Sequence, residues 1–227
     1  MGRARETWDA LAARSTEVYV GDPAGARREL DDLFARLGAD PRGGRCDEVG
    51  CGPGRMTPLL AERFDAVLGV DVSPAMLEQA RVATADLERV ELRLVSGERL
   101  DAVDDDSADV VVCYLVLQHL PSRAAVRAYV AEISRVLVPG GEAFVQLPVL
   151  EPGVRPRLWR TVRSVVVPMA AWLHRDPAGD ASFRGVRLTE AELERAVAAA
   201  GLGVVARDEG HDAPYRYSRD RFLRLRR

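Results

Sequence analysis

The stretch Glu48-Val-Gly-Cys-Gly-Pro-Gly54, followed by Ala66-Val-Leu-Gly-Val-Asp71, decides the fold. The first part ends an apolar run in alternating glycines, and the second ends an apolar run on a carboxylate. This order predicts a strand, a glycine turn, a helix and a second strand. Such a turn lets a ligand approach bare backbone, and a carboxylate such as Asp71 accepts two ribose hydroxyls. Nucleotide-like cofactors are held in this way at the carboxyl edge of a doubly wound sheet.

Beyond this stretch, short apolar runs alternate with segments of helical periodicity. The predicted strands are 45–49, 66–71, 90–95, 109–116, 142–147 and 203–209, and the predicted helices are 54–63, 74–85, 123–137 and 189–200. We expect Ser73 and Thr189 to be N-caps, the latter with Glu192 in a capping box. This alternation predicts a parallel sheet that is covered on both faces. The arginine-rich tail, residues 219–227, is interpreted as a last edge strand with solvated arginines.

Two segments fall outside the alternating pattern. Residues 4–19 and the stretch that begins at Asp22-Pro23 and ends at Gly38 have helical spacing of apolar residues. Residues 148–185 are divided by prolines into short pieces, within which one or two small helices are expected.

The composition limits the class of protein. A chain of 227 residues with 47% hydrophobic content suits one globular domain with a sizeable core. The net charge of −3 gives no overall field that would attract nucleic acid or an anionic membrane. All 32 basic residues are arginine, so no lysine is present to act as a base or Schiff-base nucleophile. The apolar runs are too short to span a bilayer, and no signal peptide is evident.

Cysteine and histidine usage gives two further expectations. The three cysteines are Cys46, Cys51 and Cys113, an odd number inside or beside apolar runs, which predicts reduced thiols and a cytoplasmic protein. The three histidines lie far apart without ligand spacing, so we expect no metal site.

Four motifs in order make the chain similar to the class I S-adenosylmethionine-dependent methyltransferases that act on small molecules. They are Glu48-Val-Gly-Cys-Gly-Pro-Gly54, then Gly69-Val-Asp-Val-Ser-Pro74, then Asp109 with Gln118-His-Leu-Pro121, and finally Leu137-Val-Pro-Gly-Gly141. Any one motif is weak evidence, whereas four in the family's order and spacing are strong. The resemblance covers residues 45–147 and again 186–209.

The resemblance implies a Rossmann-like α/β fold. Its doubly wound, mostly parallel seven-stranded sheet would have the order 3-2-1-4-5-7-6, with helices on both faces. Residues 1–40 would form an N-terminal helical cap, 41–147 and 186–227 the cofactor-binding domain, and 148–185 an inserted substrate lid after strand five. The implied activity is methyl transfer from S-adenosylmethionine to O, N or C of a small-molecule acceptor, and the composition is compatible with secondary metabolism. No nucleic acid or membrane partner is expected, and the oligomeric state stays open.

The resemblance also implies site residues. The expected cofactor-binding residues are Glu48, Gly50, Cys51, Gly52, Gly54, Asp71, Val72, Met76, Gly97, Glu98, Cys113, Tyr114 and Gln118. Ser96 is an alternative to Glu98 at the adenine amino group. The expected acceptor-site residues are Tyr19, Trp159, Trp172, His174 and Phe183. His119 is either a general base or a hydrogen-bonded structural residue, and the sequence leaves both open. A helix that starts near Gly54 would direct its free N–H groups at the methionine carboxylate of the cofactor.

Two other functions are considered. A nicotinamide-dependent oxidoreductase would require Gly-x-Gly-x-x-Gly, but the sixth position counted from Gly50 or Gly52 is Arg55 or Thr57, so the spacing rejects this class. A non-catalytic subunit that binds S-adenosylmethionine is compatible with the same motifs, because a fold and a binding site do not prove turnover. Production of S-adenosylhomocysteine with an acceptor would distinguish an enzyme from either alternative.

Overall fold

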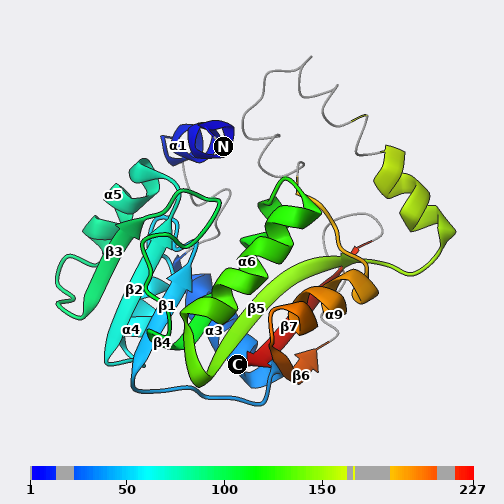
Figure 1. Cartoon of the computed structure of the whole chain (residues 1–227). Coiled ribbons are helices and arrows are strands. Elements are labelled where there is room, and N and C mark those ends of the chain that lie inside the picture. The colour runs from blue at the N-terminus through cyan, green and yellow to red at the C-terminus, as the bar shows by residue number, and fades with distance from the viewer. Residues whose placement is uncertain (1, 14–22, 163–165, 167–184, 209–217) are drawn as a thin grey trace.

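A seven-stranded sheet forms the centre of the protein (Figure 1). The computed structural model describes residues 2–13, 23–162, 166, 185–208 and 218–227. The strands are β1 (Arg45–Val49), β2 (Ala66–Asp71), β3 (Val90–Leu94), β4 (Ala108–Cys113), β5 (Leu137–Leu150), β6 (Gly203–Asp208) and β7 (Ser218–Arg226). Their order is β3-β2-β1-β4-β5-β7-β6, and only β7 runs antiparallel to its neighbours. The predicted strand order is therefore confirmed.

Helices cover both faces of this sheet. The described helices are α1 (Gly2–Ala12), α3 (Pro23–Arg36), α4 (Thr57–Ala61), α5 (Pro74–Ala83), α6 (Arg123–Val136) and α9 (Glu190–Ala199), with a short 3-10 helix η1 (Leu117–His119). Side chains of α3 and α4 share one apolar cluster with the sheet, and side chains of α6 and α9 share the other. The helix α3 therefore belongs to the main core, although the sequence grouped it with an N-terminal cap.

The central strand β4 shows why the fold forms around this sequence. Val111 and Cys113 pack in the cluster with α6 and α9, while Val110 and Val112 pack in the cluster with α3 and α4. Successive side chains of a strand point to opposite faces, so a continuous apolar run suits a strand covered on both sides. Each fully buried valine contributes about 1.5–3 kcal/mol relative to an exposed one.

Both predicted helix caps are present. The Ser73 hydroxyl accepts the backbone N–H of Met76 at 3.1 Å at the start of α5. At α9, Thr189 accepts the Glu192 N–H, and the Glu192 carboxylate in turn accepts the Thr189 N–H at 2.8 Å. Each cap satisfies a backbone donor that the helix itself leaves without a partner, which fixes where α5 and α9 begin.

Several element boundaries differ from the predictions, among them those of β5 (Leu137–Leu150 against 142–147) and two beside the glycine turn and β4. The helix expected over 54–63 is shorter, since α4 begins only at Thr57. Gly54 adopts a left-handed φ of +82° and belongs to the turn. The strand expected over 109–116 ends at Cys113, because Leu115 has a φ of +59°, which no strand accommodates. The predicted helix start at Gly54 is therefore wrong, because α4 begins at Thr57, and the direction of its free N–H groups toward a ligand stays a prediction.

The interpretation of residues 219–227 as an edge strand is wrong, although the strand order implied by the resemblance places this strand correctly. β7 lies between β5 and β6, so β6 forms that edge of the sheet. The arginines of β7 are partnered within the fold. Arg224 and Arg226 both pair with Glu142 of β5, and Arg221 pairs with Glu190 of α9. The alternation of apolar side chains around Phe222 correctly predicts a strand. The acidic residues that pair with its arginines are distant in the sequence.

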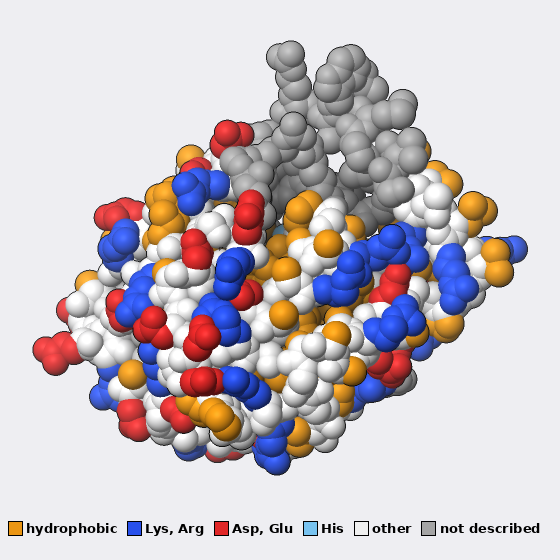
Figure 2. All heavy atoms as spheres, viewed as in Figure 1, with side chains coloured by type: hydrophobic (Ala, Val, Ile, Leu, Met, Phe, Trp, Pro, Cys, Tyr) orange, Lys and Arg blue, Asp and Glu red, His pale blue; other side chains and the backbone are white. Residues whose placement is uncertain are grey.

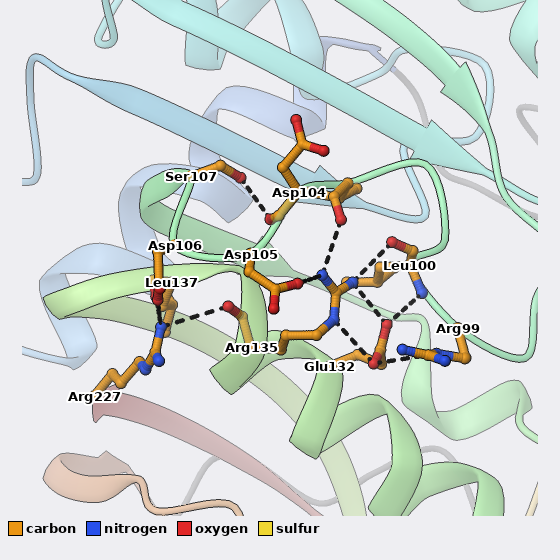
Figure 3. A network of polar contacts seen from close by, with 11 residues as sticks. Arg99, Leu100, Asp104, Asp105, Asp106, Ser107, Glu132, Arg135, Leu137 and Arg227 are labelled. Carbon is orange, nitrogen blue, oxygen red and sulfur yellow. Dashed lines mark hydrogen bonds and ion pairs between the residues drawn. The ribbon is translucent and has the colours of Figure 1, made fainter.

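A second arginine network holds the loop between β3 and β4 (Figure 3). Arg135, near the end of α6, donates to the carbonyls of Leu100 and Val103 at 2.9 Å each and pairs with Glu132 and Asp105. Glu132 also accepts the backbone N–H of Leu100 at 3.0 Å. At the chain's end, Arg227 pairs with Asp106 and donates to the carbonyl of Leu137. These contacts anchor the loop that follows β3, at whose start the adenine-binding residues are expected.

None of the described helices is both long and apolar enough to cross a bilayer. Arginine and acidic side chains are interspersed over the face shown in Figure 2.

Candidate functional site

The glycine turn connects β1 to α4 at the carboxyl edge of the sheet. Gly50, Gly52 and Gly54 all have left-handed φ angles, of +73°, +54° and +82°. The N–H groups of Gly50 and Cys51 both donate to the carbonyl of Val70 on β2, at 2.8 and 3.0 Å. A left-handed φ at three alternate positions favours glycine, because it has no side chain to clash with the backbone. The turn is therefore held rigidly against the end of β2.

The three glycines differ in what surrounds them. A Cβ at Gly50 would collide with the side chain of Val116, and a Cβ at Gly54 would lie 3.0 Å from the Cα of Ala80 on α5. These two glycines are required by close packing of the chain on itself. A Cβ at Gly52 meets no atom within 4 Å. Gly52 alone therefore presents its backbone to open space, where a ligand has room to approach.

Asp71 lies at the end of β2, opposite this turn. Its Oδ2 accepts the N–H of Gly52 at 2.9 Å, and its Oδ1 accepts the N–H of Ser73 at 2.9 Å. Burial raises the pKa of the Asp71 carboxyl, while these backbone N–H groups lower it, and the pKa remains raised. Two carboxylate oxygens offer about four lone-pair positions. The side chain is therefore fixed in orientation and keeps acceptor capacity for ligand hydroxyls.

Glu48 is buried beneath the turn. The Thr57 hydroxyl at the start of α4 donates to its Oε2 at 2.6 Å. Burial raises the pKa of Glu48 to about 7, an effect that the Thr57 hydrogen bond and the charge of Arg55 partly oppose. Arg55 itself pairs with Glu29 of α3 at 2.8 Å. In this structure Glu48 connects β1 to α4 and so supports the turn from below, and contact with a cofactor stays a prediction for it.

The predicted thiol contacts are buried. Cys51, Cys113 and Cys46 are free thiols that form no disulfide bond, and they have almost no exposed surface. Burial raises the pKa of Cys113 to about 12 and that of Cys51 well above its usual value, so both stay protonated. At these positions the backbone is what a ligand would meet. Tyr114 follows β4 and packs beside the cluster that contains α3.

The adenine side of the predicted site lies beyond β2 and β3. Gly97 has a φ of +83°, and a Cβ there would lie 2.9 Å from Val72. Gly97 and Val72 are therefore in contact. The binding of the adenine by these two residues stays a prediction. Met76 is buried on α5 in a small cluster with Leu11 and Ala12 of α1. Met76 thus packs as an ordinary core residue against α1. A contact of Met76 with the adenine stays a prediction.

The choice between Ser96 and Glu98 gains a third candidate. Both side chains are exposed at the end of β3, and the Ser96 hydroxyl accepts the Glu98 N–H at 3.3 Å. The carboxylate of Asp101 returns to the same place and accepts the Ser96 N–H at 2.9 Å. Sequence reasoning did not consider Asp101, because it is five positions from Ser96 and only the fold of the loop brings it back.

The helix α1 packs against α5 (Figure 1). Asp9 accepts the Ser73 hydroxyl at 2.5 Å, and Arg5 donates to the carbonyl of Val72 at 3.1 Å. Trp8 lies edge-on to His119, with ring centroids 5.1 Å apart. These contacts join the N-terminal helix to both sides of the predicted cofactor crevice. Asp9 and Arg5 were missed because a single polar residue on an amphipathic helix carries no motif.

Gln118 and His119 lie together in η1. The Nε2 atoms of their side chains are 3.1 Å apart, so the Gln118 amide donates and the ring nitrogen accepts. His119 thus has one ring nitrogen against Gln118 and its ring against Trp8. This arrangement is the hydrogen-bonded alternative that the sequence left open. A general-base role for His119 stays a prediction.

A polar chain that the sequence did not indicate lies at the ends of β4, β5 and β7. The Leu115 N–H donates to Oε1 of the buried Gln146 at 3.1 Å, and the Gln146 amide donates to Oδ1 of Asp220 at 2.8 Å. Arg187, which is 1% exposed, donates to the carbonyl of Gln118 at 3.2 Å, and its charge lowers the pKa of Asp220. Only the antiparallel insertion of β7 beside β5 brings these residues together, so spacing in the sequence gave no signal.

Most of the predicted acceptor-site residues lie outside the described part of the chain: Tyr19, Trp172, His174 and Phe183. Trp159 is half-buried on the helical segment 154–162, and its role stays a prediction. Among the described residues, no group of three histidine, cysteine or acidic side chains is placed to hold a metal ion.

Comparison with known proteins gives one family match. Residues 48–145 match the family model described as "Methyltransferase domain". A ubiquinone biosynthesis O-methyltransferase of Xanthomonas oryzae pv. oryzae is 33% identical over 117 residues, 51% of this chain and 47% of that protein. A trans-aconitate 2-methyltransferase of Methylobacterium radiotolerans is 40% identical over 124 residues, 53% of this chain and 44% of that protein. The chain spans about half the length of these curated relatives.

The fold also matches a solved structure over almost its whole length. The N-methyltransferase NodS from Bradyrhizobium japonicum, in complex with S-adenosyl-L-homocysteine, superposes with a TM-score of 0.68. The alignment covers 99% of this chain and 98% of NodS at 17% sequence identity. At this identity the match concerns the fold alone.

Proposed function

We propose that this chain, whose residues 48–145 match a methyltransferase domain, transfers a methyl group from S-adenosylmethionine to a small-molecule acceptor. The single observation that carries the proposal is the hydrogen bond from the Gly52 N–H to the Asp71 carboxylate. It joins a carboxylate with spare acceptor capacity to the one glycine of the turn that faces open space.

The residues fit the cofactor in two parts. Asp71 would accept the ribose hydroxyls, and the backbone of Gly52 would meet the methionine portion. Val72 and Gly97 would border the adenine, and its amino group would bond to Glu98, to Ser96 or to the neighbouring Asp101. When bound, S-adenosylmethionine supplies an electrophilic methyl group on a positively charged sulfur. The chain's part is to hold the acceptor in line with that methyl, where orientation contributes up to about 7–11 kcal/mol.

Several finer points belong to the proposal. The names of the relatives, a ubiquinone biosynthesis O-methyltransferase and a trans-aconitate 2-methyltransferase, support a small molecule as acceptor. The interspersed charges of Figure 2 give no support for a nucleic-acid partner. Secondary metabolism, a cytoplasmic location, the cap at residues 1–40 and the lid at 148–185 stay predictions.

The experiment is isothermal titration calorimetry of the purified chain with S-adenosylhomocysteine, followed by an acceptor screen that detects the same product. Binding together with product formation supports an enzyme. Binding without turnover on any acceptor would favour the non-catalytic subunit, and absence of binding would contradict both.

A further inference from the structure

We infer that Asp220 is the acceptor-binding carboxylate of this site: it accepts a hydrogen bond from the hydroxyl or amine of the acceptor and takes up that group's proton. This inference rests on the proposed methyl transfer and adds to it the class of acceptor and the residue that receives the proton.

The position of Asp220 supports the assignment. It opens β7 opposite Pro148, near the carboxyl end of β5, and one side-chain amide separates it from Leu115. Leu115 directly follows Cys113 and Tyr114, where the cofactor's methionine end is expected. The left-handed φ of Leu115 is strained for a non-glycine residue, at +59°, and Gln146 holds its N–H. Strain held in place by surrounding structure is a feature of functional sites.

The carboxylate is held at one oxygen and open at the other. Within the described part of the chain, the one hydrogen bond to Asp220 comes from Gln146 to Oδ1. The residue is half-buried, and no hydrogen bond within the described part of the chain reaches Oδ2. A carboxylate whose orientation is fixed through one oxygen can present the other to a ligand, and an ionised carboxylate accepts hydrogen bonds but donates none.

The charges around Asp220 suit a proton acceptor. Burial raises the pKa of its carboxyl, while the Gln146 hydrogen bond and the charge of Arg187 lower it, and the pKa remains raised. The Tyr114 side chain senses the same charges: its pKa is raised to about 12, chiefly by burial, with Glu29 and Asp220 also raising it and Arg55 lowering it. A raised pKa makes Asp220 a better base, and Tyr114 stays a neutral hydrogen-bond donor.

The proposed methyl transfer conserves atoms and electrons. A lone pair on the acceptor oxygen or nitrogen forms a bond to the methyl carbon while the carbon–sulfur bond breaks. The electron pair of that bond stays on sulfur and removes its positive charge, which leaves S-adenosylhomocysteine. The acceptor's proton passes to Oδ2 of Asp220 and then to water, so no other reactant is needed.

The test uses the full chain with three acceptor probes: catechol for a hydroxyl, benzylamine for an amine and trans-aconitate for a carboxylate that has no proton to lose. We expect transfer to a hydroxyl or amine probe. Asp220→Asn should keep the Gln146 hydrogen bond through its amide oxygen and keep its affinity for S-adenosylhomocysteine, while kcat falls by about 10²-fold or more. Asp208→Asn on the neighbouring strand β6, whose carboxylate pairs with Arg36, is the matched control and should leave kcat unchanged.

The pH profile separates a base from a structural role. In the wild type kcat should fall at low pH as the carboxylate is protonated, and Asp220→Asn should lack this limb. Asp220→Glu gives a second test if the asparagine variant unfolds: it keeps a negative charge near Arg187, displaces the carboxylate and should lower kcat while preserving cofactor affinity. Transfer to trans-aconitate alone, no transfer to catechol or benzylamine, or unchanged kcat in both variants would overturn the inference. Loss of S-adenosylhomocysteine binding by the wild type would instead contradict the proposed function itself.

Discussion

Asp71 accepts the backbone N–H of Gly52 at 2.9 Å, and this contact joins the end of β2 to the glycine turn after β1. It orders both halves of the predicted cofactor site before any ligand arrives. A site that is ordered in advance loses less conformational entropy on binding. The contact also means that Asp71 has two duties, because its other oxygen holds the start of α5 through the Ser73 N–H.

The three glycines of the turn should respond differently to alanine. Gly52→Ala should cost about 1–2 kcal/mol of stability from its left-handed φ alone, because its Cβ meets open space. It should nevertheless weaken binding of S-adenosylhomocysteine strongly, since the new methyl group occupies the ligand's path. Gly50→Ala should cost about 2–5 kcal/mol, because strain and the collision with Val116 add. Thermal unfolding and calorimetry on both variants test this, and equal effects on stability would contradict it.

Glu48 should make stability depend on pH. Its pKa is about 7 in the fold against an ordinary value of 4.5, so between these values the folded chain binds more protons than the unfolded chain. Stability should therefore fall as pH rises from about 4.5 to about 7, by up to roughly 3 kcal/mol. Glu48→Gln should remove this loss.

Urea unfolding at pH 5 and pH 8 measures the effect. The exposed Glu88→Gln serves as the control, whose stability should follow the wild type at both pH values. If Glu48→Gln gains no stability relative to the wild type between pH 5 and pH 8, the buried carboxyl is not perturbed as described.

If Asp220 receives the proton, the hydrogen-bonded structural role is the one expected of His119. Its Nε2 lies 3.1 Å from the Gln118 amide, and its ring packs against Trp8. Loss of a general base lowers turnover by about 10²–10⁴-fold, and we expect His119→Ala to lower kcat by less than about tenfold. A loss in the larger range, together with unchanged kcat in Asp220→Asn, would return the base to His119.

The sheet could be predicted from the sequence because its signals are local. Apolar runs, the glycine turn and the caps at Ser73 and Thr189 each lie within a few residues, and the family's motif order supplied the position of β7. The predicted start of α4 was wrong because the helix was expected to begin directly after the glycine turn, whereas Gly54 has a left-handed φ and belongs to that turn. The end of β4 was wrong because nothing in an apolar run reveals the φ of Leu115.

The parts of the site that the sequence missed depend on long-range contacts. Asp220 meets Gln146 across 74 positions, and Asp9 meets Ser73 across 64. Single polar residues on a strand or helix have no spacing pattern to identify them, and their partners are set by topology. The arginines of β7 illustrate the same limit, since Glu142 was not recognisable as their partner until β5 and β7 were seen to pair.

The most direct measurement is isothermal titration calorimetry with S-adenosylhomocysteine on the wild type, Asp71→Asn and Asp109→Asn. Asp109 is the matched control, because it also accepts a backbone N–H, that of Arg45 at 2.7 Å, near the opposite end of the sheet. We predict that the wild type binds, that Asp109→Asn binds equally, and that Asp71→Asn loses about 10- to 100-fold in affinity, as expected for one charged hydrogen bond. No binding by the wild type, or equal affinity in all three proteins, would contradict the assignment of Asp71 and Gly52 as cofactor-binding residues.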